Sequence, residues 1–458
     1  MSGMPPSLAP AAKPGAKPAT RRVAESRDQA DRARLDAAMR GFISDFGPEA
    51  AVYMEACLHC GQCAEACQFY VETGDPKYTP IWKIEPFKQA YSREMGPFAP
   101  FFRAFGLTPK VTLGELEGWQ ELLYDSCNMC GRCSLVCPAG IDIADLVEKA
   151  RHGMFEAGLV PGDYLGALAG KEQETGNPFG ISREDVRRAL LEIGRSHGVE
   201  MHVDEPRAAV VPTVSSIDLK MYPASIAATA RVLNHVGASW SFRTDGFDAD
   251  NVSLTAGDRT GQRLVTEAIV DAATRCGAEV LIMPECGHSY TEMRWEAANT
   301  VGHALPFRVL HMSEYLAECL DAGRLKLRPV TPDPEGRGVT FHDPCQLSRR
   351  SGRSDAPRKV MAALGLDLHE LADHGADSWC CGGGGGVALI NRARPLRDKA
   401  FAIKRRQVAD TGAGTVIVSC TGCRQTFEHG FKDAGGETGV GSLLDLVAGQ
   451  LEEDGKTP

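Results

Sequence analysis

The spacing of apolar residues predicts that the first third of the chain is mainly helical. Between residues 28 and 46, apolar side chains recur at steps of three and four, the spacing of one face of an α-helix; they are Leu35, Met39, Phe42 and Phe46. Gly47 and Pro48 then end this helix. A second helix is predicted from about Asp142 to Ala157, with Asp142 as its N-cap.

The pattern is weaker on both sides of this helical region. Residues 1–27 are rich in Ala, Pro and Lys near the N-terminus and are predicted to form a disordered tail. Residues 159–205 are predicted to form a Gly-rich connector with one amphipathic helix, from about Arg183 to Ile193.

Beyond the connector, short buried strands alternate with helices. The segments 266–293 and 402–427 each contain a helix, a Gly-Ala turn, a β-run (VLIM or VIV) and then a cysteine. Upstream, Tyr222-Pro223-Ala224 is predicted to correspond to Asp343-Pro344-Cys345, because a helix follows each of them. Strands that alternate with helices favour parallel sheets.

Together these patterns predict an α+β multidomain fold. A mainly α-helical domain at 28–158 is followed by the connector at 159–205. Two pseudo-symmetric α/β repeats, 206–330 and 331–458, then complete the chain.

Composition and charge narrow the class of protein. The formal net charge of -10 argues against nucleic acid as a partner. The 16 cysteines in 458 residues indicate metal binding in a reducing compartment, not a secreted disulfide scaffold. No apolar run reaches the roughly 18 residues of a membrane span, and no apolar core of an export signal follows Arg22. We expect a cytoplasmic protein that reaches the inner face of a membrane only through a partner.

Two runs of four cysteines share the spacing C-x2-C-x2-C-x3-C, which is the bacterial ferredoxin pattern. In two-cluster ferredoxins the fourth cysteine of each run binds the cluster of the other run. We therefore predict two 4Fe-4S cubane clusters, one bound by Cys57, Cys60, Cys63 and Cys137 and the other by Cys127, Cys130, Cys133 and Cys67. A pair of zinc sites is the alternative, although zinc sites usually combine two close cysteines with two distant ones.

A second set of cysteines lies in the last third of the chain and consists of Cys345, Cys380, Cys381, Cys420 and Cys423. The repeat predicts that members of this set follow strands ending at one edge of a sheet. Gly382 and Gly383 would let the backbone lie close to a bound cluster and direct N–H groups at its sulfurs. Zinc or a disulfide is the alternative, but five cysteines suit tetrahedral zinc poorly.

Three further residues are candidates beside this set. Cys286, in the segment PECGH, is either buried or supplies a ligand or a reactive thiol. His288 and His342 flank the expected site and are candidate proton donors, with a purely structural role as the alternative.

The insert between the two ferredoxin runs is rich in aromatic residues, among them Phe69, Tyr78, Phe87, Phe101 and Phe105. The favoured interpretation is a hydrophobic cover that keeps water from the clusters. The alternative is an exposed docking patch for a membrane partner.

The order of these motifs resembles that in the HdrD subunit of heterodisulfide reductases and in the related DsrK subunit of sulfite-reduction-associated complexes. A two-cluster ferredoxin domain precedes the arrangement C-x34-CC-G-x37-C-x2-C, which is similar to the CCG domain of heterodisulfide reductases. The resemblance covers about residues 50–450. This sequence departs from the usual motif at Gln68, the position at which the first cysteine run would normally have proline.

The resemblance implies both a cofactor and a partner. In the family, the CCG cysteines bind an unusual non-cubane 4Fe-4S cluster at which disulfide chemistry occurs. The expected ligands here are Cys345, Cys380, Cys381, Cys420 and Cys423. The resemblance also implies a membrane cytochrome b that exchanges electrons with quinone.

Three functions follow as hypotheses. The first is an iron–sulfur oxidoreductase subunit that passes electrons between the cytochrome b partner and a small thiol/disulfide or a sulfur-carrier protein. The second is an electron-transfer subunit of a flavin-dependent glycolate, lactate or glycerol-3-phosphate dehydrogenase. The third is a structural subunit whose clusters only stabilise the fold. The complete CCG set argues against the third hypothesis, and the single complete set favours the first over the second.

Overall fold

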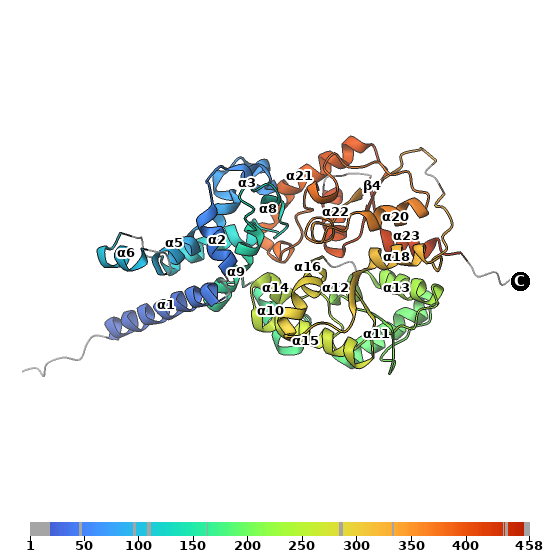
Figure 1. Ribbon diagram of the computed structural model, residues 1–458, viewed down its shortest axis with the longest axis horizontal. Coiled ribbons are helices and arrows are strands. Elements are labelled where there is room, and N and C mark those ends of the chain that lie inside the picture. Colours follow the sequence, from blue (N-terminus) through green and yellow to red (C-terminus); the bar gives the residue numbers. More distant parts are fainter. Residues whose placement is uncertain are drawn as a thin grey trace, which may run out of the picture.

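The computed structural model of the protein describes residues 19–44, 48–94, 98–107, 111–162, 164–283, 287–331, 334–433, 435 and 438–452. Figure 1 shows the N-terminal helices, in blue and cyan, on one side of the molecule. Two α/β units, one green to yellow and one orange to red, lie on the other side. The mixed helical and parallel-sheet architecture predicted from the sequence is confirmed.

The N-terminal part is built from helices of very different lengths. In chain order they are α1 (Ala19–Ser44), α2 (Pro48–Ala56), α3 (Gln62–Glu65), α4 (Gln68–Thr73), η1 (Pro76–Tyr78), η2 (Pro80–Ile84), α5 (Glu85–Glu94), α6 (Ala99–Phe105), α7 (Leu113–Gln120), η3 (Glu121–Asp125), α8 (Arg132–Leu135) and α9 (Ile143–Glu156). The predicted disordered tail is wrong for residues 19–27, which form the first turns of α1. Six of these nine residues are Ala, Arg or Glu, which have high helix propensity, and this explains the extension.

Helix α9 is the central helix of this part and matches the prediction closely. The Asp142 side chain caps it by accepting a hydrogen bond from the Asp145 N–H, at 3.1 Å. The apolar face of α9 is buried, and α9 packs along α1. Gly153 permits this contact, because a Cβ atom there would lie 2.6 Å from the Ala38 carbonyl oxygen.

The predicted connector is folded more extensively than expected. It contains α11 (Arg183–His197), as predicted, and also α10 (Leu165–Thr175), which was not predicted. Leu165 of α10 is buried in the core of the N-terminal part, and Leu190 of α11 is buried in the core of the α/β units.

The two α/β units each contain a three-stranded parallel sheet. Strands β1 (Val210–Pro212), β2 (Val280–Met283) and β3 (Arg308–His311) form the first sheet, in the order β1-β2-β3. Strands β4 (Val339–His342), β5 (Thr415–Val418) and β6 (Gly439–Ser442) form the second, in the order β4-β5-β6. Strands β2 and β5 are the two predicted β-runs, and each is central in its sheet.

The helices of the first unit are α12 (Ser216–Met221), α13 (Pro223–His235), α14 (Val252–Ala256), α15 (Arg259–Arg275), α16 (Gly287–Thr291), η4 (Glu292–Glu296), α17 (Ala297–Val301) and α18 (Met312–Asp321). Those of the second unit are α19 (Cys345–Ser348), α20 (Asp355–Ala363), η5 (Gly375–Asp377), η6 (Val387–Leu389), η7 (Asn391–Ala393), α21 (Arg394–Thr411), α22 (Thr421–Asp433) and α23 (Leu443–Gly449). One hydrophobic core takes side chains from both sheets and from α13, α18, α20 and α23, so burial of apolar surface holds the units together.

The predicted correspondence of Ala224 with Cys345 is wrong. Cys345 begins α19, three residues after β4 ends at His342. Ala224 instead lies inside α13, and α12 separates it from β1. The residue three positions after the end of β1 is Ser215, the N-cap of α12. The proline in each segment suggested the match, but prolines begin helices at many places.

Arg151 joins the three parts of the molecule at a buried junction. Its guanidinium is fully buried and donates to the carbonyl oxygens of Leu123 and Cys127 in the N-terminal part. It also donates to Thr255 of the first unit and Gly385 of the second, each at 2.7 Å. A buried charge that satisfies four carbonyl groups fixes the relative positions of these segments.

Replacing Arg151 with methionine should therefore destabilise the protein by at least about 3 kcal/mol, because four buried carbonyl groups lose their donor. Urea unfolding of the anaerobically purified protein, followed by tryptophan fluorescence, measures this change. The control is Arg188→Met on the exposed face of α11, which should change stability by less than about 0.5 kcal/mol. Equal effects of the two substitutions would contradict the junction.

Candidate metal centres

The two ferredoxin runs fold into the same backbone shape. In each run the residue before the second cysteine has a positive φ, 52° at His59 and 50° at Met129. The glycine after the second cysteine also has a positive φ, 80° at Gly61 and 73° at Gly131, and a one-turn helix follows. The left-handed conformation is accessible to glycine without strain, and it turns the chain so that the cysteines of a run converge.

The fourth cysteine of each run lies with the first three of the other run. Cys57, Cys60 and Cys63 line one cavity together with Cys137. A second cavity is lined by Cys67, Cys127, Cys130 and Cys133. Four thiols around one cavity fit a 4Fe-4S cluster. The first site is the more open, because Cys60 is exposed to solvent.

Electrostatics in these two sites follows from burial and from neighbouring sulfurs. Burial raises the pKa of Cys63, and the charges of Cys57 and Cys137 add to this effect. Burial likewise raises the pKa of Cys67 and Cys133. A buried cation, Lys83, opposes the effect at Cys67, where its Nζ lies 4.0 Å from Sγ. These thiols need a metal or a nearby cation to become thiolates.

The second cysteine set lies at the carboxyl edge of the second sheet, where α/β folds place their ligands. Cys345 begins α19 after β4, and Cys420 and Cys423 lie between β5 and the first turn of α22. Cys380 and Cys381 enter on the loop between η5 and η6. The structure therefore brings together all five predicted residues.

The five sulfurs form a continuous chain of contacts. Interactions with the side chains of Cys380 and Cys423 lower the pKa of Cys381. Cys423 in turn contacts Cys420 and lowers its pKa, and Cys380 contacts Cys345. A cluster of this kind satisfies its sulfurs poorly with protons alone, whereas iron can bind all of them. The donor set therefore fits an iron–sulfur group.

The glycines after Cys381 have no space for side chains. The N–H groups of Gly382 and Gly383 point to the sulfurs of Cys380 and Cys381, each at 3.4 Å. A Cβ atom at Gly383 would lie 2.0 Å from Thr426 Oγ1. The backbone can thus follow the sulfurs only because these residues are glycines.

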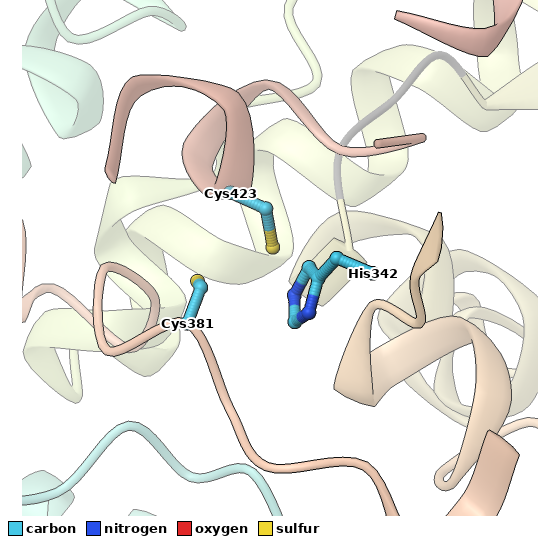
Figure 2. Close-up of side chains that lie close together, drawn as sticks. All are labelled: His342, Cys381 and Cys423. Atoms are coloured by element: carbon cyan, nitrogen blue, oxygen red, sulfur yellow. The ribbon is translucent and has the colours of Figure 1, made fainter. Parts of the chain in front are cut away.

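His342 lies beside this set with no conventional partner. Its side chain is fully buried, and neither ring nitrogen makes a well-formed hydrogen bond with any residue that the structure describes. Figure 2 shows the ring beside Cys381 and Cys423, and the closest ligand atoms of the three residues lie within 4.8 Å of one another. Burial lowers the pKa of His342, and contact with the Cys381 sulfur opposes this shift.

His288 lies beside the glycine loop that follows Cys381. A Cβ atom at Gly384 would lie 2.8 Å from its Cε1. Its Nε2 is 3.2 Å from the Asn128 carbonyl oxygen and 3.0 Å from Gln346 Nε2. Burial lowers the pKa of His288 to about 4, so the ring is neutral at pH 7. The proton-donor role of His288 and His342 stays a prediction, and Cys286 lies outside the described residues.

The second ferredoxin site and the second cysteine set are in direct contact. Cys130 packs against the buried cluster that contains Cys380, and its interaction with the Cys380 side chain lowers the pKa of Cys130. Cys380 also lines the cavity of the second ferredoxin site. A polar bridge supports the contact, because Asn128 Nδ2 donates to the carbonyl oxygens of Gly382 and Gly384 at 2.9 and 2.8 Å. Gln68 Nε2 donates to Asn128 Oδ1 at 3.0 Å.

Several residues at this contact were not predicted from the sequence. Asn128 lies between two cysteines of a run, where any residue type is compatible with the motif. Lys404 lies on α21 among other basic residues. Its side chain is fully buried beside the second cysteine set, and nothing in the sequence indicates this burial. Gln68 was noted only as the residue that replaces a proline, and its role in the polar bridge gives that departure a structural reason.

The aromatic insert divides into a buried and an exposed part. The rings of Phe69, Tyr78 and Phe87 are buried, as the cover interpretation predicts for them. Phe101 and Phe105, on α6, are 54% and 67% exposed and pack against each other. The docking interpretation is therefore confined to exposed aromatic residues, which are Trp82 in η2 and those around α6. Helix α6 extends from the N-terminal part in Figure 1.

A large polar cavity of about 1080 Å³ opens beside the second ferredoxin site. Its wall includes Met129, His288 and Gln346, and its rim carries both acidic and basic side chains. Among the described residues, no helix has the length and apolar character needed to cross a bilayer.

Comparison with known proteins gives the class of the chain. Residues 53–141 match the 4Fe-4S dicluster domain, and residues 339–428 match the cysteine-rich domain known as CCG. The chain is therefore an iron–sulfur protein that combines these two domains.

Two relatives narrow the class further. The chain is 26% identical over 410 residues to the HdrD subunit of the dihydromethanophenazine:CoB–CoM heterodisulfide reductase of Methanosarcina barkeri, covering 87% of this chain and 94% of that protein. It is 24% identical over 416 residues to an Hdr-like menaquinol oxidoreductase iron–sulfur subunit of Archaeoglobus profundus, covering 81% of this chain and 74% of that protein. The chain is thus similar, over most of its length, to HdrD-type iron–sulfur subunits of oxidoreductases.

The crossed arrangement of the fourth cysteines gives a direct test. Cys67→Ser should change the spectrum of the cluster at Cys127, Cys130 and Cys133, because Cys67 lines that cavity. Cys137→Ser should change the other ferredoxin cluster. Electron paramagnetic resonance of the reduced protein measures both effects, with Cys276→Ser as a buried control far from these sites. A Cys67→Ser protein altered only in the cluster of its own run would rule out the crossing.

Proposed function

We propose that the chain is a subunit that carries electrons between a quinone-linked membrane partner and a thiol/disulfide substrate. The partner is a cytochrome b-type protein, and the substrate is a small thiol/disulfide or a sulfur-carrier protein. The contact between Cys130 and Cys380 supports this function most strongly. It connects the second ferredoxin site directly to the CCG site, so that electrons can pass from one to the other. The name of the Archaeoglobus relative, a menaquinol oxidoreductase subunit, supports the quinone link.

In this proposal each set of cysteines has its own task. Cys57, Cys60, Cys63 and Cys137 hold the outer cubane cluster, and Cys67, Cys127, Cys130 and Cys133 hold the inner one. Cys345, Cys380, Cys381, Cys420 and Cys423 hold a non-cubane 4Fe-4S cluster at which the substrate reacts. When bound, these groups would supply one-electron transfer. Two such transfers, together with two protons taken up from solvent, convert one disulfide into two thiols.

The other residues of the site orient and shield it. The N–H groups of Gly382 and Gly383 stabilise negative charge on the sulfurs of Cys380 and Cys381. The polar cavity beside His288 and Gln346 provides the route by which substrate reaches the site. The two α/β units act as a pseudo-symmetric pair of which only the second keeps the cysteine set, so one substrate site is expected.

We place the protein in the cytoplasm, at the inner face of the membrane, bound through its partner. The exposed rings of Phe101 and Phe105 on α6 are the candidate contact surface, since apolar side chains on a protruding helix suit a protein interface.

Metal content tests the number of clusters. Protein purified without oxygen should contain about twelve irons per chain with equal sulfide, as three four-iron clusters require. Mass spectrometry of the metals and a sulfide assay measure this. Zinc as the main metal would contradict the iron–sulfur assignment, and about eight irons would remove the third cluster.

Cys381→Ser tests the substrate site. It should abolish reduction of the CoB–CoM heterodisulfide and of oxidised glutathione by reduced viologen, because Cys381 is the central sulfur of the chain of contacts. The two ferredoxin clusters should still be reduced, and Cys319→Ser, in the hydrophobic core, should retain activity. Normal turnover of the Cys381→Ser protein would refute the assignment.

A second function is favoured by one relative. The chain is 26% identical over 427 residues to the EtfAB:quinone oxidoreductase of Syntrophomonas wolfei, covering 86% of this chain and 57% of that protein. That similarity supports an electron-transfer subunit that serves a flavoprotein dehydrogenase. The two functions differ in the assay above, because such a subunit would accept electrons from a reduced flavoprotein and would reduce no disulfide.

A further inference from the structure

A buried lysine with no carboxylate partner lies beside the CCG site. Lys404 is on α21, its side chain is fully buried, and its Nζ donates to Ser378 Oγ at 3.0 Å. Among the described residues, no carboxylate lies within ion-pairing distance of it, since no such pair is found up to 4.0 Å. A buried ammonium group is costly unless an opposite charge compensates it.

The charges that act on Lys404 identify the compensating group. They come from Asp343 and from the sulfurs of Cys380, Cys381 and Cys423. Asp343 is already neutralised, because Arg358 binds both of its oxygens at 2.8 Å. Among the described residues, the cysteine sulfurs are therefore the groups left to compensate the Lys404 ammonium group, and they carry negative charge when they bind a cluster as thiolates.

The burial of Lys404 is consistent with an anionic CCG site. Burial lowers the pKa of Lys404, and the negative groups around it oppose that shift. Other cationic side chains of α21 are less buried than Lys404. Arg397 is only partly buried and lies 3.9 Å from Asp398, and Lys399 is exposed. Solvent screens the charge of an exposed lysine far more than that of a buried one.

We propose that Lys404 raises the reduction potential of the cluster held at the CCG site by placing a fixed positive charge beside its sulfurs. This inference rests on the proposed function, because it needs a cluster bound by Cys380, Cys381 and Cys423. Each reduction step adds one electron, supplied by the neighbouring ferredoxin site or by dithionite in a titration, and breaks no bond. The added negative charge is stabilised by the ammonium group, and net charge and solvent exposure are known determinants of iron–sulfur potentials. Lys404 thereby favours transfer of electrons from the ferredoxin clusters to the CCG site.

The test is a redox titration with dithionite, followed by electron paramagnetic resonance, on the whole protein. Lys404→Met and Lys404→Gln should each lower the equilibrium constant for reduction of the CCG cluster at least tenfold, which corresponds to about 59 mV for one electron. The glutamine variant keeps a donor to Ser378 and removes only the charge. Lys404→Arg keeps the charge and should retain the wild-type potential. Lys399→Met, on the same helix, should change nothing, and the ferredoxin clusters should keep their potentials in every variant.

Each other outcome decides the question. A potential in Lys404→Met and Lys404→Gln equal to that in Lys399→Met overturns the proposal, and so does an equal shift of all three clusters. If the uncharged variants lose the CCG cluster, the Lys404→Arg variant decides between two explanations. A cluster retained in Lys404→Arg supports the need for a positive charge. A cluster lost in Lys404→Arg as well overturns the proposal and assigns Lys404 a packing role. Wild-type protein with only about eight irons would instead refute the proposed function itself.

Discussion

The contact between Cys130 and Cys380 is the interaction on which the functional architecture depends. It joins a cysteine of the N-terminal helical part to one of the second α/β unit, residues far apart in the sequence. Its geometry is fixed from both sides. Asn128 holds the glycine loop by two hydrogen bonds, and Arg151 holds the same loop through Gly385. A displaced loop would separate the ferredoxin sites from the CCG site, and electron transfer between them would slow with distance.

Burial has two opposite consequences around this contact. It keeps water from the inner sites, and it raises the cost of every uncompensated charge there. The two buried lysines are compensated by different groups. Lys83 contacts Cys67 and the Ser126 carbonyl oxygen. Lys404 donates a hydrogen bond to Ser378 and interacts electrostatically with the CCG sulfurs. Both arrangements indicate that the cysteine sites carry negative charge in the functional protein.

The sequence predicted those features that depend on local spacing. The ferredoxin runs and the strands β2 and β5 were found because cysteine spacing and buried β-runs are visible over a few residues. Strands β3 and β6, the helix α10 and the Asn128 bridge were not predicted, because tertiary contacts decide them. Lys404 is the clearest example of a feature that the sequence could not predict. On α21 it stands among Lys and Arg residues that face solvent, and only the packing of α21 against the CCG loop buries it.

A single path through the inner ferredoxin cluster and the CCG cluster is the feature that most needs a direct test. Pulsed electron paramagnetic resonance provides it, by measuring spin–spin interaction between the two clusters when both are paramagnetic. Contact through Cys130 and Cys380 predicts a strong interaction that broadens both signals and speeds their relaxation. Two sharp signals that relax independently would contradict the single path, because they would place the clusters too far apart for this contact.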